Sequence, residues 1–282
     1  MQPGQPSRTA MGAAILRAAH QVLEGGRLFS DPLALRILGP AGEEAVRAAG
    51  LDPAKGRLRL FIALRSRFAE DALGQCFQQG VRQLVVLGAG LDTYAYRNPL
   101  GEGLRMFEVD HPSTQAWKRE RLAAAGIPVP GNLTYVPIDF EREPLAEGLV
   151  RCGFDPGQAS FFSWLGVVPY LTEEAIFSTL GCIASLPGGA RVVFDYGNPA
   201  DAPGPDAWAA DREALAQRVA SVGEHLRSHF ATQDLHARLG ALGLRVVEDL
   251  GPALMRERFL GVKDDSLPDR GGHILLAASA CR

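Results

Sequence analysis

The chain has 282 residues, 46% hydrophobic and 22% charged, so it can bury a full core as one large domain or two small ones. Its net charge of −3 excludes the basic surface of a nucleic-acid-binding protein, and we expect no nucleic-acid partner. No apolar run has the length of a membrane span and no signal peptide is visible, so we expect no membrane association. The cysteines lack metal-ligand spacing and fit a reducing cytoplasm: Cys76, Cys152, Cys182 and Cys281.

The residues before position 80 are predicted to be mostly helical. A first helix over 9–24 ends at a glycine pair, and a second begins at Ser30 or Asp31, where Pro32 suits the first helical position. Two more helices are predicted over 41–49 and 58–77. We therefore expect residues 1–80 to form a helical cap or lid and residues 81–282 to form the core domain.

From residue 81 onward, predicted strands and helices alternate. This order predicts an α/β fold with a seven-stranded, mostly parallel sheet and helices on both faces. The link from 249 to 273 has no clear helical period, so the last two strands are free to pair antiparallel. The strands are expected at 83–87, 104–109, 133–138, 160–167, 191–196, 244–249 and 273–278, with helices at 113–125, 173–185, 206–227 and 232–242.

The first strand runs directly into a glycine turn, Gly88-Ala89-Gly90, that the rest of the core is organised around. Glycines one residue apart allow a tight turn whose N–H groups come close to a ligand. Asp110 closes the next strand about 20 residues later, the arrangement that binds ribose hydroxyls in nucleotide-binding proteins. Thr93 occupies the place of the third glycine of a dinucleotide fingerprint. The pattern favours an adenosine-containing cofactor without a pyrophosphate over NAD.

Six segments together resemble the leucine carboxyl methyltransferase family of class I S-adenosylmethionine-dependent methyltransferases. They occur in the family's order: LFSDPLA (28–34), LRSRFAED (64–71), LGAGLDTYAYR (87–97), FEVDHP (107–112), YVPIDF (135–140) and WLGVVPYLT (164–172). The resemblance implies a Rossmann-like class I methyltransferase fold with an N-terminal helical cap, S-adenosyl-L-methionine as cofactor, and methyltransferase activity.

The resemblance also assigns the turn and the end of the second strand. In the family the glycine turn passes under the cofactor, which assigns cofactor contacts to Gly88, Ala89 and Gly90. The aspartate of the FEVDHP segment, Asp110, is implied to bind the ribose.

Further positions carry over at the adenine and at the amino-acid end of the cofactor. Asp139 and Phe140 are implied to flank the adenine. Arg65 is the best match for the arginine that binds the cofactor carboxylate, with Arg67 as second choice, because a guanidinium can clamp a carboxylate with two hydrogen bonds. Where many relatives have a cofactor-contacting glutamate, this chain has Leu165. Either backbone carbonyls bind the cofactor amine or this part of the pocket is rearranged.

Methyl transfer is an in-line displacement whose main demand is alignment of the reacting groups. A carboxylate acceptor is already ionised and needs no base, and the apolar segment around residues 164–168 would give it a dry wall. A hydroxyl acceptor would use a base, for which His111 and Tyr196 are candidates, although each has a structural role open to it. His225 and His229 lie four apart but lack a third ligand, so we expect a solvated helix face and no metal.

Three functions follow in order of preference. The first is an S-adenosylmethionine-dependent O-methyltransferase that acts on a small-molecule carboxylate or hydroxyl. The second is a catalytically inactive protein that binds the same cofactor, which Leu165 would favour. The third is a nicotinamide-dependent oxidoreductase, which the missing third glycine disfavours. The sequence identifies neither the acceptor nor the oligomeric state.

Overall fold

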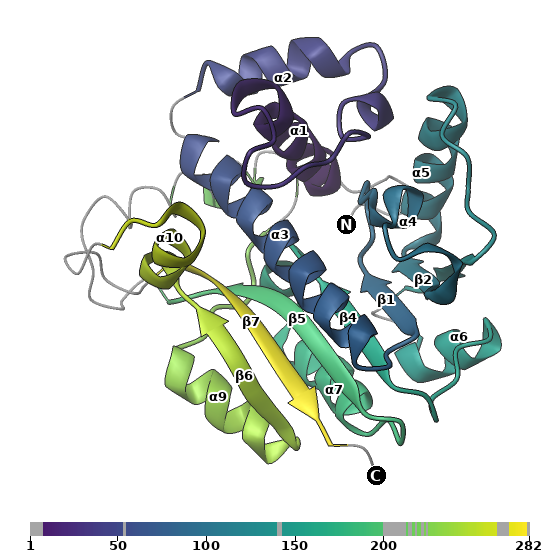
Figure 1. The fold of residues 1–282 in the computed structure, drawn as a ribbon. Helices are drawn as coiled ribbons and strands as arrows, with labels where there is room; N and C mark the ends of the chain where they lie inside the picture. Colours follow the sequence, from purple (N-terminus) through teal and green to yellow (C-terminus); the bar gives the residue numbers. More distant parts are fainter. Residues whose placement is uncertain are drawn as a thin grey trace.

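The computed structural model describes residues 8–52, 55–139, 143–199, 225–263 and 271–280, together with 213, 216, 217, 219, 220 and 223. Within these residues the chain forms the predicted α/β fold around one seven-stranded sheet (Figure 1). The sheet order is β3-β2-β1-β4-β5-β7-β6. The strands are β1 (Gln83–Leu87), β2 (Arg105–Asp110), β3 (Leu133–Pro137), β4 (Ser160–Trp164), β5 (Ala190–Gly197), β6 (Leu244–Leu250) and β7 (Gly272–Ser279).

The first five strands pair in parallel, and β7 inserts antiparallel between β5 and β6. The mostly parallel sheet and the antiparallel pairing of the last two strands are therefore confirmed. Because β1 to β5 run in parallel, their carboxyl ends meet at one edge of the sheet. The order reverses between β1 and β4, and such a switch point opens a crevice where ligands bind in α/β proteins.

Helices cover both faces of the sheet. The helical elements are α1 (Arg8–Leu23), η1 (Arg36–Leu38), α2 (Gly42–Gly50), α3 (Gly56–Gln78), α4 (Tyr94–Arg97), η3 (Gly101–Gly103), α5 (Pro112–Ala124), α6 (Leu145–Arg151), η4 (Val168–Tyr170), α7 (Glu173–Ala184), α9 (Thr232–Ala241) and α10 (Pro252–Leu260). Apolar residues of α6, α7 and α9 pack on one face, and those of α3, α4 and α10 pack on the other.

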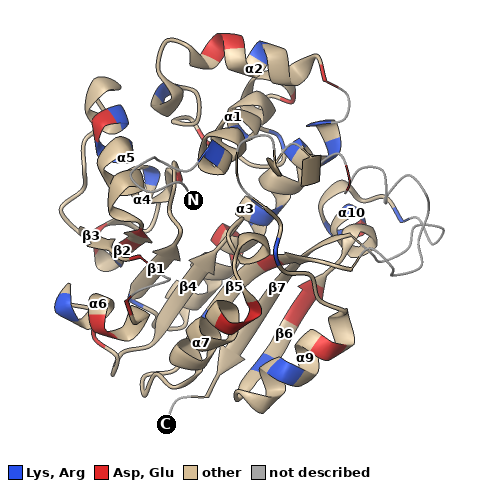
Figure 2. Ribbon diagram, turned by 180° about the vertical axis from the view of Figure 1, so that it is seen from behind, with Lys and Arg blue, Asp and Glu red and all other residues tan. Residues whose placement is uncertain are grey.

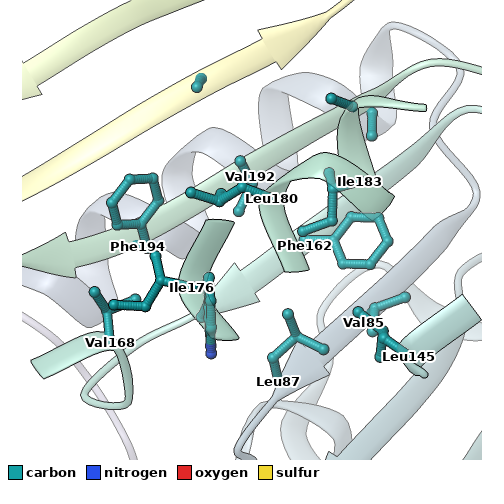
Figure 3. Packing of buried hydrophobic residues seen from close by; sticks show 14 of the residues in the cluster. Val85, Leu87, Leu145, Phe162, Val168, Ile176, Leu180, Ile183, Val192 and Phe194 are labelled. Atoms are coloured by element: carbon teal, nitrogen blue, oxygen red, sulfur yellow. The ribbon is translucent and has the colours of Figure 1, made fainter. Parts of the chain in front are cut away.

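Alternate residues of each strand supply the two cores. All five residues of β1 are buried, as expected of a central parallel strand covered on both sides. Figure 3 shows the larger core, where side chains of β1, β4 and β5 meet the apolar stripe of α7. That stripe has helical spacing and consists of Ile176, Leu180 and Ile183, all with no exposed surface.

Helix α1 packs on both α2 and α3, and α1 and α2 lie beyond the sheet in Figure 1. Helix α3 also belongs to the core of the sheet, because Leu64, Phe68 and Leu73 share a buried cluster with strands β1 and β4. In Figure 2 helices α2, α5 and α9 each carry both acidic and basic residues. Among the described helices, none combines the length and apolarity needed to cross a bilayer.

Two predicted elements differ in the structure. The helix expected from Ser30 or Asp31 to residue 39 is instead a series of turns followed by the short 3-10 helix η1, because the buried Asp31 carboxylate accepts the N–H of Leu33 at 3.1 Å and turns the chain locally. The strand predicted over 160–167 ends at Trp164, since Gly166 adopts a φ of 71° that strand geometry excludes.

Three α-helices in the described part of the chain were not predicted. Helices α4 and α6 are too short for a periodic pattern to stand out, whereas α10 has recognisable end signals. Pro252 lies in its first turn and Gly261 ends it with a φ of 66°. The helix predicted over 206–227 lies mostly outside the described residues, and its described end, 225–227, is not helical.

Replacing Leu180 with Ala tests the larger core. We expect the change to lower the free energy of unfolding by about 2–5 kcal/mol, because it leaves a cavity among fully buried side chains. Chemical denaturation monitored by circular dichroism would measure the loss. Leu254 of α10 is 42% exposed, so Leu254→Ala is the matched control and should change stability far less. Equal losses in both variants would contradict this placement of the core.

Candidate functional site

Four sequence-predicted positions meet at the carboxyl edge of the parallel strands. Gly88 follows β1, Asp110 ends β2, Asp139 follows β3 and Leu165 follows β4. Asp139 and Leu165 are half-buried. The neighbouring Phe140, predicted to flank the adenine, lies outside the described residues. The edge thus collects the described candidates beside the β1/β4 switch point.

The glycine turn is built as the spacing requires. Gly88 and Gly90 have φ values of 66° and 45°, a region that residues with a side chain rarely adopt. A Cβ on Gly88 would lie 2.4 Å from a methyl carbon of Val167, and a Cβ on Gly90 would lie 3.0 Å from the Cβ of Ala10. The turn is therefore packed between the loop after β4 and helix α1.

The N–H groups of this turn do not point at a ligand, contrary to expectation. Gly88 N and Ala89 N both donate to the carbonyl of Val109, at 2.8 and 3.2 Å, and Gly90 N donates to the Asp110 carboxylate at 2.6 Å. Residues at the end of β2 therefore accept the hydrogen bonds of all three N–H groups. A turn without spare N–H groups is poorly suited to a pyrophosphate, in keeping with the missing third glycine.

Asp110 fixes the turn and still has capacity for a ligand. Its Oδ2 accepts from Gly90 N and its Oδ1 accepts from His111 N at 2.7 Å. Burial raises the pKa of the Asp110 carboxyl, and these two backbone donors oppose the rise. A carboxylate has about four lone-pair sites, so each oxygen can accept one more hydrogen bond, as from a ribose diol.

The two candidate arginines lie in different surroundings. Arg67 is exposed and bonds Asp71 and the carbonyl of Leu28, both at 3.1 Å. Arg65 is directed to the end of β4, where its guanidinium lies 2.6 Å from the position of a Cβ on Gly166. Of the two, Arg65 lies at the carboxyl edge of the parallel strands.

A buried network that was not predicted from the sequence joins helix α1 to the glycine turn. Asp31 has no exposed side-chain surface. It forms an ion pair with Arg17, whose Nε lies 2.9 Å from its Oδ2, and accepts a hydrogen bond from Thr93 Oγ1 at 2.7 Å. Arg97 Nε bonds Thr93 Oγ1 at 3.0 Å, and its guanidinium forms a two-pronged ion pair with Glu70. Three of the family-like segments, 28–34, 64–71 and 87–97, meet in this network. Their joint presence was the signal that could have revealed it.

A second buried ion pair lies on the same strand as Asp110. Glu108 and Lys118 are each 1% exposed and their charged atoms are 2.7 Å apart. Burial raises the pKa of Glu108 to about 7, against the lowering effect of the Lys118 ammonium. The pair links α5 to β2, and its acid, Glu108, lies two residues before Asp110.

The two candidate bases both have structural partners. His111 caps α5: its Nδ1 lies 2.7 Å from Ser113 Oγ and accepts the Ser113 N–H at 3.2 Å. The buried Tyr196 donates its hydroxyl to Asp249 Oδ2 at 2.7 Å and stacks on His273 with ring centroids 4.8 Å apart. Among the described residues, no group of three His, Cys, Asp or Glu side chains could hold a metal ion.

The apolar wall expected around residues 164–168 is only partly available. Trp164 and Val168 have no exposed surface and belong to the core beside α7. Leu165 and Val167 are half-buried, and Val167 touches the glycine turn. The apolar surface at the strand edge therefore comes from these two side chains.

This set of groups suits an adenosyl amino acid. Asp110 can accept from a ribose diol, Arg65 is a guanidinium of the type that pairs with a carboxylate, and both lie at the strand edge beside the glycine turn. S-adenosylmethionine combines these features and has no phosphate. The residues present therefore fit that cofactor.

Comparison with known proteins agrees with this assignment. The family model for leucine carboxyl methyltransferase matches residues 10–184. A Bacillus subtilis protein assigned as an S-adenosyl-L-methionine-dependent methyltransferase, YktD, is 36% identical over 72% of this chain and 67% of its own length. A Saccharopolyspora erythraea protein with the same assignment is 33% identical over 66% of each chain. The chain thus spans about two thirds of both relatives.

Solved structures share the fold. A DUF574 family protein from Streptomyces avermitilis aligns with a TM-score of 0.56 and 17% identity, covering 95% of this chain and 97% of its own. A protein from Thermobifida fusca assigned as a methyltransferase aligns with a TM-score of 0.57 and 15% identity, covering 99% and 96%. At such identities the likeness concerns the fold alone.

Replacing Gly88 with Ala tests the turn. We expect a loss of about 1–3 kcal/mol in the free energy of unfolding, because Ala is strained at this φ and its methyl would meet Val167. Gly74, inside α3 with open space around the position of its Cβ, is the matched control. Gly74→Ala should stabilise the protein by about 0.5–1 kcal/mol. Chemical denaturation of both variants would measure these changes. If Gly88→Ala left the free energy of unfolding unchanged, the turn would not be constrained.

Asp249 gives a pH-dependent prediction. Burial would raise the pKa of its carboxyl, but hydrogen bonds and charge from His273, with Tyr196 and His236, hold the pKa below the ordinary value of 3.8. Its contribution to stability is therefore present above pH 3.8 and is lost as pH falls below that value through the folded-state pKa. The stability difference between wild type and Asp249→Asn should shrink as pH falls from 5.5 to 3, measured by urea unfolding. A difference independent of pH would refute this assignment.

Proposed function

Because the chain belongs to the leucine carboxyl methyltransferase family of S-adenosylmethionine-dependent methyltransferases, we propose that it methylates an oxygen atom of a small molecule, preferably a carboxylate. S-adenosylmethionine supplies a methyl group made electrophilic by the sulfonium that carries it. The remaining question is what the protein's own residues do to bind the reactants and to select the acceptor.

The binding part of the proposal uses the edge of the sheet. Asp110 binds the ribose hydroxyls with the lone pairs left by Gly90 N and His111 N. Arg65 binds the cofactor carboxylate, and the cofactor lies along the glycine turn and the loop that carries Val167. Asp139, half-buried two residues after β3, accepts from the adenine amino group in this proposal.

The observation that favours a carboxylate is the engagement of both candidate bases in the scaffold. His111 uses Nδ1 to cap α5, and Tyr196 is buried with its hydroxyl on Asp249. An alcohol must lose a proton as it is methylated, whereas a carboxylate is ionised at neutral pH and needs no base. The half-buried Leu165 and Val167 exclude water, which favours the joining of a negative acceptor and a positive methyl donor.

Two measurements on the purified protein test this function. Thermal unfolding should shift upward by about 5 °C or more with S-adenosylmethionine or S-adenosylhomocysteine at 100 times the dissociation constant, where binding adds about 2.7 kcal/mol, and should not shift with NAD. Labelled methyl groups should then pass to small carboxylic acids as base-labile esters.

Controls separate the alternatives. Asp110→Asn should remove the cofactor-induced shift. If base-stable methyl products formed instead from hydroxyl compounds, the acceptors would be hydroxyls and not carboxylates. A cofactor-induced shift without transfer to any acceptor would favour an inactive binding protein, and a shift only with NAD would overturn the proposal.

A further inference from the structure

Arg65 forms a buried ion pair with an acid that the sequence analysis did not single out. Its Nη1 lies 2.8 Å from Asp195 Oδ2, and the two side chains are 11% and 5% exposed. Asp195 Oδ1 accepts the backbone N–H of Gly166 at 2.5 Å. One carboxylate therefore binds both the candidate cofactor arginine and the loop that follows β4.

The strand register places this acid beside Leu165. Trp164 of β4 pairs with Phe194 of β5, so the next residue of β5, Asp195, adjoins the next residue of the β4 segment. Neighbouring strands lie about 4.8 Å apart. A carboxylate on β5 can therefore serve nearly the same point of the edge as a carboxylate at position 165.

Contacts connect the pair to the glycine turn. Arg65 lies against Gly166, whose neighbour Val167 contacts Gly88. Asp195 lies on the face of the sheet that α3 covers, because its strand neighbour Val193 belongs to the cluster on that face. The pair thus lies on the α3 side of the sheet, beside the loop after β4, and not in the opposite core.

The charges of the pair complement an α-amino acid. Each Asp195 oxygen accepts one hydrogen bond, from Arg65 or from Gly166 N, and has a further lone pair, and Arg65 has N–H donors beyond Nη1. A buried ion pair contributes little net stability compared with apolar residues of the same size, so a binding role gives it a reason to exist. A zwitterion would meet the guanidinium with its carboxylate and the acid with its ammonium.

Two other acids near Leu165 have other partners. Asp92 and Glu70 line, with Leu165, a cavity of about 20 Å³, room for one water molecule. Both carboxylate oxygens of Glu70 accept hydrogen bonds from Arg97. Asp92 accepts from Tyr94 N at 2.8 Å and forms an ion pair with Arg17 of α1 at 3.6 Å.

We propose that Asp195 binds the ammonium group of the cofactor's amino-acid end, the task that an acid at position 165 would otherwise perform, while Arg65 binds its carboxylate. The inference rests on the cofactor and on the Arg65 assignment above, and it is independent of the methyl acceptor.

Binding calorimetry with four ligands tests the proposal without any acceptor. The ligands are S-adenosylhomocysteine, its analogue without the carboxylate, its analogue without the amine, and 5′-methylthioadenosine, which lacks both groups. Asp195→Asn keeps an oxygen that can accept a hydrogen bond but removes the charge. Asp71→Asn, in the exposed ion pair with Arg67, is the matched control.

We expect Asp195→Asn to weaken S-adenosylhomocysteine and the amine-bearing analogue by about tenfold or more, the usual effect of losing a charged hydrogen-bond partner. The amine-free analogue and 5′-methylthioadenosine should bind as to wild type. Arg65→Gln should instead weaken the binding of the carboxylate-bearing ligands, S-adenosylhomocysteine and the analogue without the amine. Asp195→Glu should restore part of the preference for the amine, and Asp71→Asn should change nothing.

Other results would overturn the proposal. An equal loss for all four ligands in Asp195→Asn would assign the residue to the scaffold. A loss confined to carboxylate-bearing ligands would mean that it only positions Arg65. A selective loss of the amine-bearing ligands in Asp92→Asn, with Asp195→Asn unaffected, would move the ammonium site to the glycine turn. Failure of wild type to bind S-adenosylhomocysteine would refute the cofactor site as well, which distinguishes it from failure of this proposal alone.

Discussion

The bonding between the glycine turn and the end of β2 is the constraint on which the site depends. Val109 and Asp110 accept all three N–H groups of the turn, so the strand that supplies the acid also sets the shape of the glycines. The glycines are needed for their positive φ values and for the missing side chains, not for ligand-facing amides. The same local pattern that binds a pyrophosphate in a dinucleotide-binding protein can thus form a platform for a cofactor without phosphates.

The N-terminal helices depend on this turn in their own way. Ala10 of α1 lies against Gly90, and Arg17 donates to the carbonyl of Leu91. The buried Asp31 then holds Arg17 and Thr93 together. Buried charges are expensive unless each has its partners, so the N-terminal helices and the turn stabilise each other.

Local patterns in the sequence predicted much of the fold. The apolar run of β1, the glycine turn and Asp110 lie close together in the chain, and their roles in the strand and the turn follow from period and residue type. Asp31 was misjudged for the opposite reason: a helix start was expected from its position before Pro32, but its buried contacts come from α1 and from Thr93. Such tertiary contacts leave no mark on a local pattern, and only the joint resemblance of distant segments hinted at them.

Asp195 shows the same limit at the site itself. In the sequence it is one acid within an apolar strand, 30 residues after Leu165, and nothing local connects the two positions. The parallel register of β4 and β5 makes them neighbours. Since adjacent strands deliver their ends to the same edge, an acid can be lost from one strand and its charge supplied by the next without any change of fold. A departure from a family pattern at one position is therefore best judged against the neighbouring strand, where here the acid also bonds Arg65.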